Sequence, residues 1–136
     1  MNELHKSGTL PERCELKKGL RLQIDDPENR RITQPSGVIR GWFAALDCEL
    51  PETFEFRIDG IVLPHKMVAR EDVEESMPDH LIAGFDIPYD LVPYLPYIQD
   101  RRLIVHLKLP DFDSIALRFK IEESALASCL ADAGGV

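Results

Sequence analysis

The stretch that decides the fold reads Phe54-Glu55-Phe56-Arg57-Ile58-Asp59-Gly60, and the apolar run Ile61-Val62-Leu63 follows it directly. Apolar residues at every second position of the first run predict a half-buried strand, with the charged residues on its outer face. Asp59-Gly60 provides the positive φ angles of a two-residue turn. The stretch therefore predicts an antiparallel hairpin.

The same alternation recurs on both sides of this hairpin, in runs of six to eight residues. Both faces are largely apolar in the run that contains Gly41-Trp42, which is typical of a central strand, and the glycine there allows a ring or a neighbouring backbone to approach closely. Pro88 favours an edge or the end of a strand, because proline cannot donate to a ladder. The expected further strands are residues 20–25, 37–44, 84–89, 103–109 and 115–121.

Helix is expected at only two places. Val73 and Met77 stand four residues apart among acidic residues before Pro78, which predicts a single helical turn in a crossover. Leu126 and Leu130 are also four apart, among alanines, and predict a short helix near the C-terminal end. Residues 90–100 are expected to form a loop rich in proline and tyrosine, and residues 110–113 a four-residue hairpin loop.

These elements predict an all-β fold: an antiparallel, immunoglobulin-like β-sandwich of about seven strands, with one short crossover helical turn and a short C-terminal helix. A closed barrel is the alternative. We expect residues 1–18 to be a polar N-terminal tail, residues 19–122 the sandwich domain, and residues 123–136 a short helix with a flexible C-terminus.

Composition restricts the class of protein further. The chain has 136 residues, of which 44% are hydrophobic, so one domain with one core is expected. A formal net charge of −8 argues against general binding of nucleic acid. Three cysteines at wide spacings suggest neither a disulfide framework nor a zinc knuckle, and favour a reducing, cytoplasmic setting. We expect no export signal and no membrane span.

The order of landmarks resembles a known family. A closing hairpin follows five short motifs, which are, in chain order, Gly41-Trp42, Ile58-Asp59-Gly60, Arg70-x-Asp72-Val73, Met77-Pro78 and Ala83-Gly84-Phe85. This order is similar to that of the small β-sandwich modules attached to bacterial glycosyltransferases and methyltransferases of surface-polysaccharide synthesis. The resemblance covers roughly residues 36–121. It implies an accessory or assembly role without catalysis.

Arg70 and Asp72 are the first candidate for a site, because they stand at the start of the expected crossover turn. An arginine there can pair with a carboxylate and act as a structural clamp, which we prefer. The alternative is that Arg70 binds an anionic sugar or a phosphate through its planar fork of donors.

Three tyrosines form the second candidate. Tyr89, Tyr94 and Tyr97 are spaced by prolines and could form an exposed platform that stacks on sugar rings or docks a protein. The preferred alternative is a loop whose tyrosines cover the open end of the sandwich. Arg57, Lys108, Arg118 and Lys120 are expected on outward strand faces, where they form either a basic patch or cross-strand ion pairs.

No reaction is indicated by the sequence. The four histidines are scattered, no nucleophile elbow is present, and Cys48 has acidic neighbours that make it a poor nucleophile. We therefore expect neither an enzyme nor a metal site nor a cofactor. The expected function is a non-catalytic module that serves a bacterial polysaccharide system by binding a glycan, or a protein such as a glycosyltransferase or a methyltransferase. The alternative is an interaction or oligomerisation module unrelated to carbohydrate, with a homodimer formed through a sheet edge.

Overall fold

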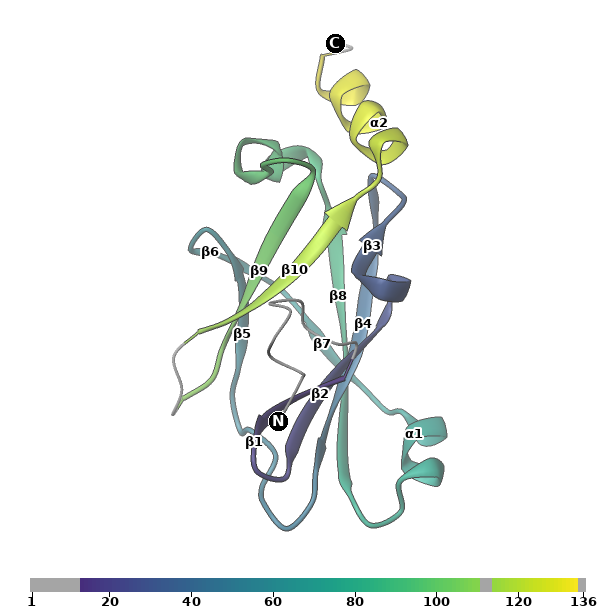
Figure 1. Cartoon of the computed structure of the whole chain (residues 1–136), viewed down its shortest axis with the longest axis vertical. Helices are drawn as coiled ribbons and strands as arrows, with labels where there is room; N and C mark the ends of the chain where they lie inside the picture. The colour runs from purple at the N-terminus through teal and green to yellow at the C-terminus, as the bar shows by residue number, and fades with distance from the viewer. Residues whose placement is uncertain (1–12, 111–113, 135–136) are drawn as a thin grey trace, which may run out of the picture.

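The computed structural model describes residues 13–110 and 114–134, which form two packed five-stranded sheets (Figure 1). The first sheet consists, in spatial order, of β1 (Arg13–Lys17), β2 (Leu20–Asp26), β4 (Ser36–Ala45), β8 (Leu81–Asp90) and β7 (Lys66–Val68). The second consists of β3 (Arg31–Ile32), β10 (Ile115–Ile121), β9 (Arg102–Lys108), β5 (Glu55–Ile58) and β6 (Ile61–Leu63). The helical segments are η2 (Glu28–Arg30), α1 (Glu71–Ser76), η3 (Val92–Tyr97) and α2 (Glu123–Gly134).

Seven of the strands have the immunoglobulin arrangement. In chain order, β2, β4, β5, β7, β8, β9 and β10 take the positions A to G, so that A, B, E and D share one sheet and C, F and G the other. Among the described strands, the pairing is antiparallel except between β3 and β10. The predicted immunoglobulin-like sandwich is confirmed, although its D strand, β7, was not expected from the sequence. The expected strand at 61–63 is β6, which lies outside these seven together with the short strands β1 and β3.

The core between the sheets consists of the side chains that alternation places inward. The apolar positions of β2, β9 and β10 are buried there as predicted. The rings of Phe43, Phe56 and Phe85 meet at the centre, with centroid separations of 5.4 Å between Phe43 and Phe85 and 5.0 Å between Phe56 and Phe85. Asp59 and Gly60, at φ angles of 50° and 86°, form the predicted turn between β5 and β6.

Gly41 lies opposite Phe85 in the pairing of β4 with β8. A Cβ atom at Gly41 would lie 2.5 Å from the carbonyl oxygen of Gln23 and 2.8 Å from Cζ of Phe85. The close approach expected at this glycine is therefore present, and it involves both a neighbouring strand and a ring.

Trp42 points away from the sandwich core. Its side chain, only 3% exposed, packs with Ala44 and Val73 in a second cluster between the outer face of the first sheet and α1. The predicted helical turn is α1, which covers this cluster because it supplies Val73 and is followed by Met77. It is not the expected crossover, since it connects β7 with β8, which are adjacent antiparallel strands of the same sheet. Both faces of β4 are buried from Gly41 to Ala45, as the sequence pattern indicates, whereas Arg40 on the outer face is exposed.

The structure differs from the sequence-based expectations at several boundaries. Arg13–Lys17 lies within the expected polar tail but forms strand β1, so the first sheet starts before Gly19; residues 1–12 lie outside the described residues. Part of the expected loop at 90–100 is the 3-10 helix η3. Most of the expected four-residue loop, at 111–113, lies outside the described residues.

Pro88 lies on β8 beyond Asp86, the last residue of β8 that is paired with β7. Among the described strands, β4 is its only partner there, so Pro88 lies near the end of the strand rather than between two partner strands. The predicted C-terminal helix is α2, which extends from the end of the sandwich near η3 (Figure 1). Its Ala125 and Cys129 are buried against the core, while residues 135–136 of the expected flexible end lie outside the described residues. Among the described helices, none has the length and apolarity that crossing a membrane requires.

Candidate binding site

The three tyrosines occupy different environments. Tyr89, on β8, is half-buried; its hydroxyl donates to the carbonyl oxygen of Gln34 at 3.1 Å, and its ring lies over Gly37. Burial is the main cause that raises the pKa of Tyr89. Tyr94, on η3, is half-buried and packs against the core. Tyr97, at the end of η3, is 38% exposed. Of the three rings, that of Tyr97 is therefore the most open to a ligand.

Tyr97 borders a hollow of about 450 Å³ on the outer face of the second sheet, which we call the Tyr97 hollow. Its wall on one side is Pro96 and Tyr97 of η3. The outward side chains of β9 and β10 form the floor: Arg102, Ile104, His106 and Arg118. Ile58, Asp59, Gln99 and Asp100 complete the lining.

A tight turn at Asp100 and Arg101 borders the Tyr97 hollow, since Gln99, Asp100 and Arg102 belong to the lining. Asp100 and Arg101 both have positive φ angles, of 54° and 58°, and the turn is closed because Gln99 and Arg102 each donate a backbone N–H to the other's carbonyl oxygen. This is the geometry of a two-residue hairpin turn, formed without glycine. It starts β9 at Arg102, so that Arg102, Ile104 and His106 share one face.

Strand register brings the basic residues together. Arg118 on β10 lies opposite Ile104 on β9, and Lys120 lies opposite Arg102. The side chains of Arg102, Arg118 and Lys120 are exposed, and none of them forms an ion pair with another described residue. These three residues therefore form a basic patch, of which Arg102 and Arg118 belong to the floor of the Tyr97 hollow.

Of the four expected basic residues, only Arg57 forms an ion pair with another described residue. Arg57 pairs with Glu55 on its own strand, with Nε 2.9 Å from Oε1, and Lys108 lies opposite the same Glu55. Arg118 and Lys120 belong to the patch as expected. Sequence reasoning missed Arg102, which lies between the expected loop at 90–100 and the expected strand at 103–109; its alternation with Ile104 was the available signal.

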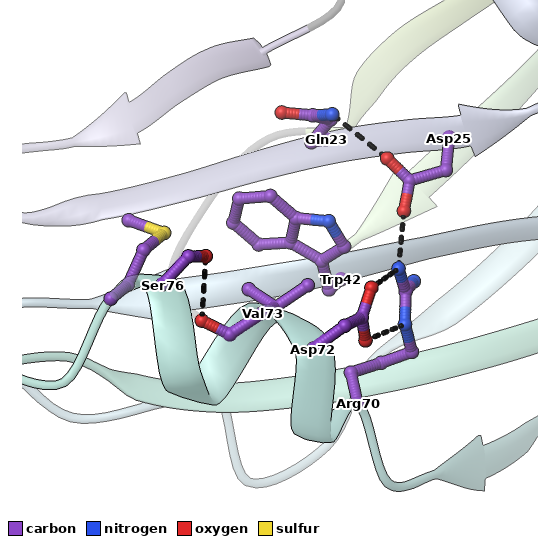
Figure 2. A pocket seen from close by; sticks show the side chains of 8 residues that line it. Gln23, Asp25, Trp42, Arg70, Asp72, Val73 and Ser76 are labelled. Atoms are coloured by element: carbon purple, nitrogen blue, oxygen red, sulfur yellow. Dashed lines mark hydrogen bonds and ion pairs between the residues drawn. The ribbon is translucent and has the colours of Figure 1, made fainter.

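Arg70 lies in a different place, on the outer face of the first sheet. Its Nε and Nη2 donate to the Asp72 carboxylate at 3.1 and 2.9 Å, and Nη2 also lies 2.8 Å from Oδ2 of Asp25 on β2 (Figure 2). The hydrogen bond to Asp72 is the main cause that raises the pKa of Arg70, and the same bond lowers the pKa of Asp72. The guanidinium thus joins the start of α1 to β2, which is the pairing expected of a structural clamp.

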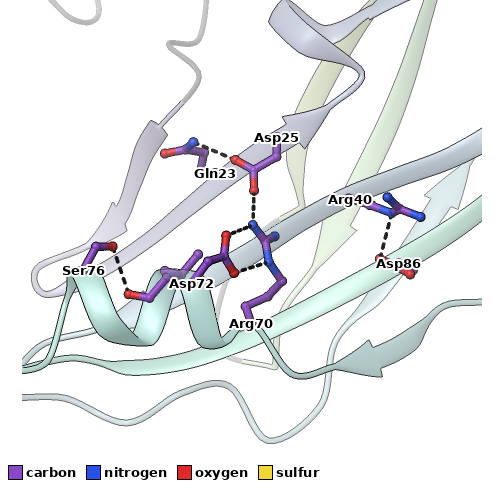
Figure 3. A network of polar contacts seen from close by, with 8 residues as sticks. Gln23, Asp25, Arg40, Arg70, Asp72, Ser76 and Asp86 are labelled. Carbon is purple, nitrogen blue, oxygen red and sulfur yellow. Dashed lines mark hydrogen bonds and ion pairs between the residues drawn. The ribbon is translucent and has the colours of Figure 1, made fainter.

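Gly84 makes room for the clamp. A Cβ atom there would lie 2.7 Å from the carbonyl oxygen of Val68 and would collide with the Arg70 stem. Gln23 donates to Asp25 at 2.8 Å and so extends the network, while Arg40 and Asp86 form a separate pair at 3.6 Å nearby (Figure 3).

A pocket of about 610 Å³ opens above Trp42, between β2 and α1 (Figure 2). The clamp residues Asp25, Arg70 and Asp72 line one part of it, and Ser76 and Met77 line another. Two of the three guanidinium nitrogens of Arg70, Nε and Nη2, are already engaged by the carboxylates of Asp72 and Asp25. The Tyr97 hollow, whose arginines have no such partners among the described residues, is therefore the better candidate for a binding site.

Within residues 13–110 and 114–134, no three His, Cys, Asp or Glu side chains are arranged to hold a metal ion. Comparisons of the chain with protein-family models, with curated proteins and with solved structures found no match.

Proposed function

We propose that this protein is a non-catalytic binding module of a bacterial polysaccharide system, and that it binds an acidic glycan through the Tyr97 hollow and the adjoining basic patch. The observation that carries the proposal is an exposed aromatic ring beside two guanidinium groups, those of Arg102 and Arg118, which form no ion pair with another described residue. An aromatic face can stack on a sugar ring, and a guanidinium binds a carboxylate through two parallel hydrogen bonds.

The sequence resemblance to modules of glycosyltransferases and methyltransferases supports the choice of a glycan, and it names the enzymes expected as protein partners. The free thiol of Cys48 supports a cytoplasmic location, where such enzymes would be found.

The binding test compares an acidic with a neutral polymer. Isothermal titration with polygalacturonate and with dextran should give binding only to polygalacturonate. Tyr97→Ala and Arg118→Gln should each weaken that binding by about tenfold. Each removes one or two contacts that together contribute about 1.4 kcal/mol to the free energy of binding. Tyr97→Phe keeps the ring and should bind normally.

Arg21→Gln is the matched control for charge. Arg21 is exposed on the first sheet and, among the described residues, has no ion pair, so its replacement changes the net charge equally without touching the hollow. Equal weakening by Arg21→Gln and Arg118→Gln would show a general charge effect and would contradict the proposed site. Recovery of a glycosyltransferase or methyltransferase in a native pull-down would support the proposed partners.

A second candidate function is self-association through β6. This strand is the outer edge of the second sheet, and its Ile61 and Val62 are 42% and 49% exposed. An apolar edge strand can pair with the same strand of a second copy. Sedimentation velocity should then show a dimer that Val62→Lys dissociates, and a monomer at all concentrations would exclude this function.

A further inference from the structure

We infer that the Tyr97 hollow selects one carboxylate-bearing sugar residue, of the hexuronate class, over densely charged sulfated or phosphorylated polymers. This inference rests on the proposed function and specifies its ligand. It follows from the combination of an apolar wall, two guanidinium groups and two carboxylates in one hollow.

The apolar part of the hollow suits the C–H face of a sugar ring. Tyr97 and Pro96 form one wall and Ile104, 38% exposed, lies in the floor. A volume of about 450 Å³ lies at the small end of the range for ligand pockets, about 300–1,000 Å³, so it holds a short segment of a chain rather than a long one.

The two guanidinium groups suit a carboxylate at the edge of that ring. Arg118 stands opposite Ile104, and Arg102 precedes Ile104 by two residues on the same face, so the arginines are diagonal neighbours across β9 and β10. Diagonal neighbours are about 7–8 Å apart at their backbones, a span that two long side chains can close on one carboxylate.

The two acidic residues distinguish a uronate from a polyanion. Asp59 and Asp100 are exposed in the lining and, among the described residues, neither forms an ion pair. Carboxylates accept hydrogen bonds from sugar hydroxyls but repel sulfate and phosphate groups. The hollow thus balances two guanidinium groups against two carboxylates, which suits one carboxylate accompanied by several hydroxyls.

The test uses three probes in heteronuclear NMR titrations of the full chain: an oligogalacturonate, the same oligomer fully methyl-esterified, and dextran sulfate. The ester keeps the ring and removes the charge, so it should bind at least tenfold more weakly than the acid. Arg118→Gln should abolish this preference. Asp59→Asn should weaken binding of the oligogalacturonate and tighten that of dextran sulfate, and asparagine retains the positive φ angle of the turn.

The outcomes separate the inference from the proposed function. Tighter binding of dextran sulfate than of the oligogalacturonate, with both weakened by Tyr97→Ala, would overturn the hexuronate subsite and leave acidic-glycan binding at the hollow in place. Equal binding of the acid and its ester would also overturn the subsite. Absence of binding to every acidic probe would overturn both. Chemical-shift changes at Tyr97, Arg102 and Arg118 with the oligogalacturonate alone would support both.

Discussion

At the residue scale, two glycines determine where side chains can lie. Gly41 admits the Phe85 ring and the backbone of β2 on the core side of β4, and Gly84 admits the Arg70 stem on β8. In both places the neighbouring atoms include a backbone carbonyl oxygen, which cannot move aside without disturbing a strand. Gly41 and Gly84 are therefore required because a side chain would not fit at these positions. Gly60, by contrast, is favoured because its turn has a positive φ angle.

Gly41→Ala should destabilise the protein by about 2–3 kcal/mol, because the added methyl group overpacks the core beside Phe85 and the carbonyl of Gln23. Urea unfolding followed by far-UV circular dichroism measures the loss. Gly60→Ala is the comparison: it meets no atom within 4 Å and should cost only about 1–2 kcal/mol, the strain of its positive φ angle. Equal losses would contradict the packing explanation.

At the element scale, α1 is short and depends on its attachments. A helix of six residues is unstable alone in water, so its position on the first sheet has to come from tertiary contacts. Val73 supplies an apolar contact with the Trp42 cluster, and Arg70 supplies the polar contact with Asp25. The clamp therefore holds the cover over the single tryptophan of the chain.

Arg70→Met should release α1 and expose Trp42, since methionine preserves the apolar stem but removes both ion pairs. Tryptophan emission should shift to the red, and quenching by acrylamide should rise severalfold, while the circular dichroism of the sandwich is retained. Arg40→Gln, which removes the neighbouring pair with Asp86, is the matched control and should leave the emission unchanged. Unchanged quenching in Arg70→Met would show that apolar contacts alone hold α1.

The Arg70–Asp72 bond also predicts a pH dependence. Because the bond lowers the pKa of Asp72 in the folded state, its stabilising effect is complete above the ordinary value of 3.8 and is lost as the pH falls through the lowered value. The difference in stability between the native protein and Asp72→Asn should therefore be constant from pH 7 to about pH 5 and should vanish in strong acid. A difference that grows below pH 3.8 in urea titrations would contradict the assignment.

At the scale of the whole molecule, charge is distributed unevenly over the two sheets. The chain carries a net charge of −8, and acidic α1 lies on the first sheet, yet Arg102, Arg118 and Lys120 gather on the outer face of the second. A local basic patch on an acidic protein binds anions at short range while the rest of the molecule repels them. This limits the size and charge of the polymers that the patch can attract.

Binding of an oligogalacturonate should consequently depend only weakly on salt. Raising NaCl from 50 to 500 mM should reduce its affinity by less than about tenfold, because the contacts include stacking and hydrogen bonds and few phosphate-like charges are neutralised. Titrations at four salt concentrations give the slope. A loss of a thousandfold would indicate a general polyanion site instead.

Much of the fold was predictable because alternation of apolar residues is a local property. The core positions of β2, β9 and β10 and the helices α1 and α2 were expected from periods of two and of about four residues, and the Asp59-Gly60 hairpin from its turn residues. Strand β1 and the turn at Asp100-Arg101 were not, since one has a polar sequence and the other lacks the usual glycine.

The sequence by itself determined which side chains face the core and which face outward, because that choice depends on neighbouring residues along one strand. Only the tertiary structure decided which outward side chains meet. The strand register places Arg118 opposite Ile104 and therefore near Arg102. The helix η3 places Tyr97 beside these two arginines. In the first sheet, β2 places Asp25 within reach of Arg70. These contacts join segments distant in sequence, and no local period encodes the register and crossovers on which they depend.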